Sequence, residues 1–174
     1  MRRQRNQLML MAAVLFLTAA GYIGMKNYNA GHREESETES YPVVELDAAS
    51  VTRISLDNEN GSYSFQKEGE EWICGEDELP EADASLVEDL VKKAVSIHSE
   101  DRIEEVGDLS QYGLAEPVIS VSIQTEQADL QFNIGDYNSA VSKYYICVEG
   151  ENTVYTIDST LRSSFAKDLD DFRK

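Results

Sequence analysis

The first 33 residues of this chain contain no acidic residue, whereas the remaining 141 contain all 33 Asp and Glu. Within the acid-free part, an uncharged run extends from Leu8 to Ile23, behind Arg2, Arg3 and Arg5. Basic residues before such a run stay in the cytoplasm, while the run carries the following chain across the membrane. We therefore expect a single-pass protein of the cell membrane, with a cytoplasmic N-terminus and an extracytoplasmic C-terminal domain.

The apolar run is short for a membrane span. It holds 16 uncharged residues and continues to Met25 before Lys26, at the lower end of the ~17–25 residues that a spanning helix needs. Two interpretations remain open: residues 1–25 form an uncleaved anchor, or a secretory signal is cleaved after the small residues at 18–20. Both interpretations place the following domain outside the cytoplasm.

Apolar residues are nearly absent from residues 26–41, which carry a cluster of Glu, Ser and Thr. Such a segment cannot bury enough surface to fold. We therefore expect an acidic, flexible tether with a mean reach of roughly 20–24 Å. The remaining residues, 42–174, are numerous enough for one domain with a hydrophobic core.

Basic residues are scarce, because only ten of the 15 Lys and Arg follow residue 33. This scarcity excludes nucleic acid as a partner, since binding a polyphosphate needs a basic surface. The sequence also lacks a Gly-rich phosphate loop, a helix with paired His and a Cys-x-x-Cys motif. Their absence removes the commonest nucleotide, zinc and redox sites, respectively. Ser164 and Lys167 spell Ser-x-x-Lys, but the accompanying Lys-Thr-Gly is missing. We expect no catalytic residue, metal or cofactor.

Cysteine is also rare, with only Cys74 and Cys147 in the whole chain. Both lie in predicted strands, and an extracytoplasmic location permits a disulfide between them. Two interpretations remain: a pair of small, largely buried thiols, which we favour, or a disulfide.

Alternation of apolar and polar residues predicts strands over most of the domain. The first hairpin comprises Val51 to Leu56 and Ser62 to Lys67, with Asn60-Gly61 as its turn. One helix follows Asp83, and its apolar stripe predicts a core face. Further strands are predicted at 118–124, 130–135, 144–149 and 154–158, before a short closing helix from Ser159 to Leu169. We therefore predict an α+β fold of mainly antiparallel strands and hairpins packed on an amphipathic helix.

Two segments between these elements are candidate sites. The first is a structural corner formed by Tyr112, Gly113, Leu114 and Pro117. Gly113 can take a positive φ, and the proline fixes the backbone as it enters the next strand. We expect the Tyr112 hydroxyl to find a backbone partner there, as half-buried tyrosines usually do.

The second candidate follows Gly135, where Asp136, Tyr137 and Asn138 are predicted to form a polar loop. This loop offers a small binding surface.

A resemblance to a known family rests on several of these segments taken together. They are Trp72 after a hairpin, the helix that follows Asp83, and residues 108–117, 133–136, 144–146 and 154–155. The chain resembles the bacterial family called domain of unknown function 4340 over roughly residues 43–165. The resemblance implies an N-terminal anchor and a role in the cell envelope, because some members occur with transporter or gliding-motility components. This chain differs in holding a single short copy, where many members are longer.

Together these features predict a non-enzymatic binding or accessory module that acts by contact with an envelope or transporter protein. The alternative is a cell-surface hydrolase or carbohydrate-active enzyme that uses carboxylates, which are plentiful here. A cleft with convergent, perturbed carboxylates would favour the enzyme, whereas an apolar groove or exposed strand edge would favour the module. The sequence does not define the oligomeric state.

Overall fold

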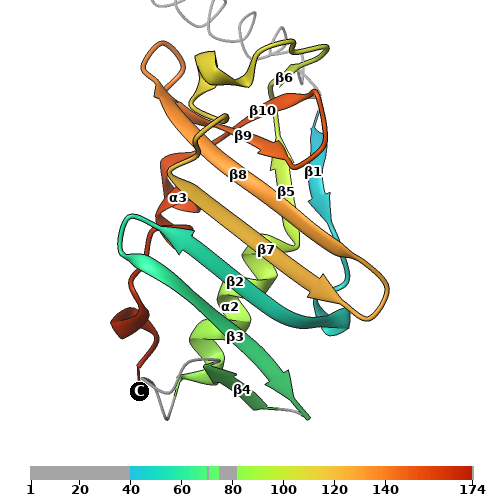
Figure 1. Cartoon of the computed structure of the whole chain (residues 1–174), viewed down its shortest axis with the longest axis vertical. Coiled ribbons are helices and arrows are strands. Elements are labelled where there is room, and N and C mark those ends of the chain that lie inside the picture. Colours follow the sequence, from blue (N-terminus) through green and yellow to red (C-terminus); the bar gives the residue numbers. More distant parts are fainter. Residues whose placement is uncertain (1–39, 70, 75–81, 174) are drawn as a thin grey trace, which may run out of the picture. The chain divides into compact units, whose positions relative to one another are not determined.

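An antiparallel sheet of eight strands forms the centre of the domain (Figure 1). The structure is a computed structural model that describes residues 40–69, 71–74 and 82–173. The strand order is β4-β3-β2-β7-β8-β9-β10-β6, and a second sheet pairs β1 with β5. The strands are β1 (Tyr41–Glu45), β2 (Val51–Asn58), β3 (Gly61–Glu68), β4 (Glu71–Cys74), β5 (Ser96–Ser99), β6 (Arg102–Ile103), β7 (Ile119–Thr125), β8 (Asp129–Asn138), β9 (Lys143–Val148) and β10 (Val154–Ile157). The helices are α2 (Ala84–Ala94) and α3 (Ser159–Phe165), with short 3-10 turns η1 (Ala48–Ser50), η2 (Leu109–Tyr112) and η3 (Leu169–Phe172).

The first hairpin joins β2 to β3 as predicted, but its turn lies one residue earlier. Asn58 and Gly61 form the last pair, so Glu59 and Asn60 are the turn residues. The Asn58 side chain accepts a hydrogen bond from the Asn60 N–H at 2.8 Å, which closes the turn locally. Gly61 then begins β3 with a φ of 130°, a conformation that favours glycine.

The predicted amphipathic helix is α2. Its N-cap is Asp83, whose carboxylate accepts a hydrogen bond from the Ser85 N–H at 2.9 Å. The predicted core stripe is confirmed, because one side of the helix is buried along its length. The buried residues are Val87, Leu90, Val91 and Ala94.

The closing helix α3 ends at Phe165, four residues before the predicted Leu169. The β2–β3 hairpin supplies the reason. The Asn58 side-chain amide donates to the carbonyls of Phe165 and Lys167, each at 2.9 Å. These bonds satisfy carbonyls that a longer helix would have satisfied internally, so the hairpin caps the helix from outside.

After α3 the chain makes a second turn, η3, which ends in the core. Asp168 and Asp171 form a reciprocal capping box at its start. Phe172 is fully buried, with its ring centroid 5.9 Å from that of Tyr63 and 5.0 Å from that of Phe65. The C-terminal segment is therefore part of the core.

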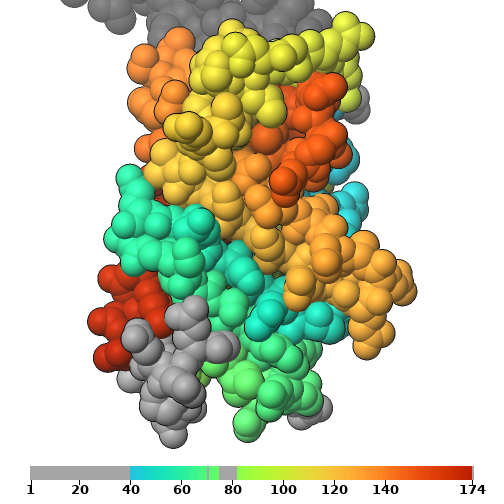
Figure 2. Space-filling model, in the orientation of Figure 1, coloured from blue at the N-terminus to red at the C-terminus, as the bar shows by residue number. Residues whose placement is uncertain are grey.

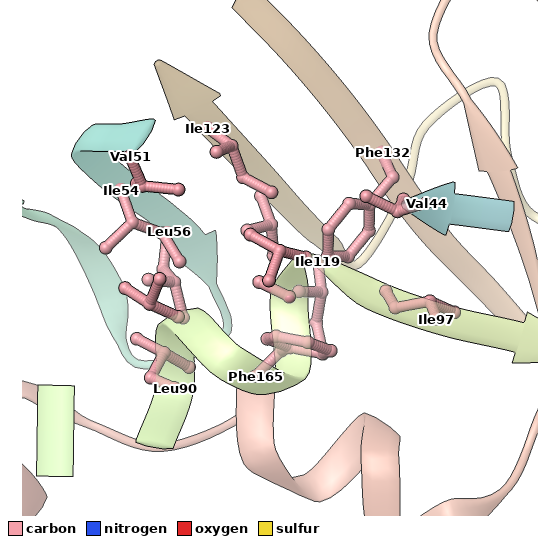
Figure 3. Packing of buried hydrophobic residues seen from close by; sticks show 14 of the residues in the cluster. Val44, Val51, Ile54, Leu56, Leu90, Ile97, Ile119, Ile123, Phe132 and Phe165 are labelled. Carbon is pink, nitrogen blue, oxygen red and sulfur yellow. The ribbon is translucent and has the colours of Figure 1, made fainter. Parts of the chain in front are cut away.

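The main hydrophobic core lies on one face of the sheet (Figure 3). Side chains from the sheet point toward α2, α3 and the β1–β5 pair, which lie on that face (Figures 1 and 3). They include Ile54, Leu56, Ile119, Ile123 and Phe132 from the sheet, Leu90 from α2 and Phe165 from α3. A mainly antiparallel sheet covered by helices confirms the α+β class of the described domain.

The opposite face of the sheet is covered at one end. There the segment that contains η2 packs against β9 and β10. The buried members of this smaller cluster are Val106, Leu114, Cys147 and Val154. Over β2, β3, β7 and the first part of β8, no element of the described chain covers this second face (Figures 1 and 2).

The part of the chain that the structure describes contains no helix long and apolar enough to span a bilayer. The predicted anchor at residues 1–25 and the predicted tether as far as residue 39 lie outside the described residues. The described residues from Ser40 onward belong to one compact unit.

Candidate functional site: a polar sheet face

The two candidate segments of the sequence lie in direct contact. Gly113 follows η2 with a φ of 68°, the left-handed conformation expected from the sequence. A Cβ atom on Gly113 would lie 2.8 Å from the backbone nitrogen of Asp136, and one on Gly135 would clash with the carbonyl oxygen of Tyr112. The backbone of the corner therefore packs directly against the backbone of β8, and only glycine fits at these two positions.

The prediction of a polar loop at residues 136–138 is wrong, because these residues belong to β8. A bulge between Ile134 and Tyr137 interrupts the ladder, and pairing resumes where Tyr137 faces Tyr144. A bulge adds residues to one strand without ending it. In the sequence, the glycine and aspartate of this bulge resemble the end of a strand, which explains the wrong prediction. Asn138 donates to the Tyr145 hydroxyl at 2.6 Å, an internal contact.

The Tyr112 side chain packs without the expected backbone bond. Its ring lies edge-on to Tyr145, with 4.8 Å between the centroids, and it borders the cluster that contains the buried Leu114. Within the described residues, its hydroxyl has no hydrogen-bond partner. Pro117 then leads into β7. The contacts of this segment hold it on the sheet through apolar packing.

The two cysteines are free thiols. Cys74 borders the main core from β4, whereas Cys147 lies in the smaller cluster on the opposite face. Five strand steps separate β4 from β9 in the sheet. At the usual strand spacing, the two strands lie roughly 24 Å apart, whereas a disulfide needs Cα atoms within about 7 Å. The disulfide alternative is therefore excluded. Burial, with Glu151 nearby, raises the pKa of Cys147 to about 11, which keeps it a thiol near neutral pH.

The uncovered face of the sheet is polar, and its charged side chains surround an uncharged central row. Its side chains alternate along β2, β3, β7 and β8 with those of the main core. In Figure 2 the segment with η2 (yellow) covers the upper part of this face, and the four strands are visible below it. The outward residues, which we call the serine face, are Arg53, Ser55, Asp57, Ser62, Ser64, Gln66, Glu68, Ser120, Ser122, Gln124, Asp129, Gln131 and Asn133.

Hydrogen bonds between strands hold several of these side chains in place. Ser120 donates to the Asn133 side-chain oxygen at 2.8 Å, and Ser122 donates to that of Gln131 at 3.0 Å. Gln131 also donates to Asn133 at 3.2 Å. Each amide and hydroxyl still has unused donor or acceptor positions. The face therefore presents a fixed set of groups that can bind uncharged polar partners.

The serine face contains a shallow depression of about 410 Å³. Ser55, Ser64, Ser120 and Ser122 contribute to its lining, together with one carboxylate, Asp57. Asp57 accepts a hydrogen bond from the Ser62 hydroxyl at 2.7 Å. No group of three or more potential metal ligands occurs within the described residues. The lining of the depression is therefore suited to forming hydrogen bonds with a binding partner.

Arg53 is the residue of this face that sequence reasoning missed. Among the arginines of the described chain, the other three each pair with a carboxylate at 2.9 or 3.0 Å. Arg53 has no ion pair there, and its buried Nε atom has no hydrogen-bond partner. Its cross-strand neighbours are the neutral side chains of Gln66 and Gln124. The alternation of β2 could have indicated its face, but not its lack of a partner.

A second polar cluster links β9, β10 and the end of β5. Lys143 of β9 contacts Glu100 at 3.0 Å and Asp101 at 2.9 Å, and Thr156 of β10 donates to Asp101 at 2.8 Å. The hydrogen bonds between Lys143 and Asp101 raise the pKa of the lysine and lower that of the carboxyl. This cluster joins the end of β5 to β9 and β10.

Comparison with known families gives one finding. The family model described as domain of unknown function (DUF4340) matches residues 72–174, more than half of the chain. The chain belongs to the DUF4340 family. No curated protein and no solved structure matches it. In this DUF4340 member, β2 and β3 lie between β4 and β7 in the sheet although they precede the matched residues.

Proposed function

We propose that this DUF4340 member is a membrane-anchored, extracytoplasmic binding module that docks a protein of the cell envelope, such as a transporter component, on its serine face. The observation that carries the proposal is the absence of charge from the centre of this face. The chain as a whole is 28% charged residues, yet the row across the middle of this face, Ser64, Ser55, Ser122 and Gln131, carries no charge. The charged outward residues, Arg53, Asp57, Glu68 and Asp129, lie around that row. Charged residues are depleted at the centres of protein interfaces.

The ordering of the side chains also supports docking. Binding costs free energy when it immobilises flexible side chains. Here Ser120, Ser122, Gln131 and Asn133 are already held by hydrogen bonds to one another. Short serine side chains also leave room for the larger side chains of a partner. The face can therefore form an interface with little rearrangement.

Arg53 indicates one group that the partner should supply. Among the described arginines, Arg102, Arg162 and Arg173 each pair with a carboxylate, whereas Arg53 does not. A guanidinium can bind a carboxylate through two parallel hydrogen bonds. We therefore expect the partner to place an Asp or Glu side chain against Arg53, between Gln66 and Gln124.

The arrangement of carboxylates favours binding over the enzymatic alternative. Glycoside hydrolysis usually requires two carboxyl groups that face each other across the scissile bond. Among the described residues that line the depression, Asp57 is the one carboxylate. It is engaged with Ser62.

A photo-crosslinking amino acid at Ser122 in the full chain, expressed in its native host, tests the docking. We expect one discrete adduct, whose partner should in turn crosslink to β2 or β7 when the photoreactive group is placed in that partner. The matched control carries the group at Glu88, an exposed residue of α2 on the other side of the sheet.

Two variants sharpen this test. Ser64→Arg should abolish the Ser122 adduct, because a long cation would fill the depression, and Arg53→Gln should weaken it more than Arg53→Lys. An adduct of equal yield from Glu88, or none from Ser122, would contradict the proposal.

A further inference from the structure

The turn between β8 and β9 exposes apolar side chains. Four large hydrophobic residues are exposed in the described part of the chain, and the two most exposed, Tyr137 and Val141, each at 49%, belong to this hairpin. Val141 lies in the four-residue turn between Asn138 and Lys143, the last pair of the ladder. We call residues 137–143 the hairpin tip.

The hairpin tip also lacks acidic residues. Residues 137–148 form the longest acid-free stretch after residue 33, in a chain with 33 Asp and Glu. Lys143 is the one charged residue in this stretch, and it forms ion pairs with Glu100 and Asp101, so that the three groups together carry a net charge of −1. The tip is therefore the part of an acidic domain at which contact with lipid requires the least desolvation of charge.

The hairpin tip lies at the end of the domain where the described chain begins. Tyr41 at the start of β1 pairs with Ser99 at the end of β5. Lys143 contacts the two residues that follow Ser99, and it lines one pocket of about 340 Å³ together with Ser40. Figure 1 shows the β8–β9 turn at the end of the sheet opposite β4.

We propose that the hairpin tip contacts the lipid headgroup region of the membrane that carries the N-terminal anchor. This inference rests on the anchor of the proposed function. Tyrosine is enriched at membrane–water interfaces, where its ring lies in apolar surroundings and its hydroxyl remains hydrated. The chain enters the domain beside the hairpin tip, and a tether of this length reaches only roughly 20–24 Å. The contact would turn the domain toward the bilayer and leave the serine face free to bind.

The experiment places a tryptophan at the tip of the full chain, as Val141→Trp, and reconstitutes the chain in phosphatidylcholine vesicles. We expect lipids brominated near the headgroup to quench the added fluorescence about twofold, since interfacial contacts reach the headgroup–acyl boundary. The matched control is Ile73→Trp, at a residue 38% exposed on β4, at the other end of the sheet. The parent chain, whose one tryptophan, Trp72, is buried, gives the baseline.

Equal quenching of Val141→Trp and Ile73→Trp, or none in either, would overturn the inference. Ala140→Trp, at the neighbouring exposed residue of the same turn, repeats the test if Val141→Trp fails to fold. Flotation of the vesicles after a carbonate wash separates the two proposals. A chain that floats without quenching contradicts the hairpin contact alone, whereas a chain that does not float contradicts the anchor and the contact with it.

Discussion

Removing the ring of Phe172 tests whether the C-terminal segment holds the domain together. Phe172 is the third residue from the C-terminus, yet it is fully buried. Its ring packs against Tyr63 and Phe65 of β3, and the Lys167 ammonium lies over it at 5.3 Å from the centroid. The Phe172 carbonyl also accepts a hydrogen bond from the Asp83 N–H at 2.7 Å, beside the start of α2.

We expect Phe172→Ala to lower the free energy of unfolding by about 3–5 kcal/mol, the usual cost of truncating a buried Phe to Ala. A loss of this size is a large fraction of the about 5–15 kcal/mol that stabilises a typical domain. The cavity would open between η3 and β3, where the Phe172 ring packs on Tyr63 and Phe65.

The assay is urea unfolding of a fragment that begins at Ser40, followed by tryptophan fluorescence and circular dichroism. Val118→Ala is the matched control, because Val118 is 41% exposed and its truncation should change the unfolding free energy by under about 0.5 kcal/mol. A loss below about 1 kcal/mol for Phe172→Ala would refute the conclusion that the C-terminus belongs to the core.

Three further predictions concern single contacts. Gly135→Ala should destabilise the domain by about 1–3 kcal/mol through its clash with the Tyr112 carbonyl, whereas Gly107→Ala, with open space around it, should be nearly neutral in the same urea assay. Asn58→Ala should cost about 1–3 kcal/mol, because the carbonyl of Phe165, at the end of α3, loses the Asn58 donor and that of Lys167 keeps only the Tyr63 hydroxyl; a melting temperature equal to that of the parent chain would show that water replaces the bonds. Burial raises the pKa of Tyr63 to about 12, so the folded state holds this proton more tightly than the unfolded state. The stability that the neutral phenol contributes is present below about pH 10 and is lost as the pH rises toward about 12. Tyr63→Phe should flatten this part of the pH profile, and an unchanged slope would assign it to other groups.

Local patterns in the sequence predicted the local elements. The stripe through Leu90 repeats every three or four residues, and this period alone defines the buried side of α2. The hairpin at Asn58–Gly61 was also predicted, because its turn residues are adjacent in the chain. Phe172 was missed since it stands alone after an acidic segment and has no periodic neighbours. Its burial depends on β3, about a hundred residues away in the chain.

The corner illustrates a different limit. The positive φ of Gly113 follows from the turn itself, so the sequence indicated it. The requirement for glycine at 135 comes from the Tyr112 carbonyl across the sheet, and no local pattern contains that contact. Arg53 is similar. The alternation of β2 places it outward, but its lack of an acidic partner depends on the neutral residues of β3 and β7 beside it.

The sheet order has a consequence for how the family domain should be defined in this chain. The family match begins at residue 72, within β4. In the sheet, β4 bonds to β3, which bonds to β2, and only β2 reaches β7. A fragment that started at residue 72 would lack the two strands that connect its edge strand to the meander. It would also lose Arg53, Ser55 and Ser64 from the serine face. Both the fold and the proposed interface therefore require the chain from β2 onward, and any binding experiment should begin before residue 51.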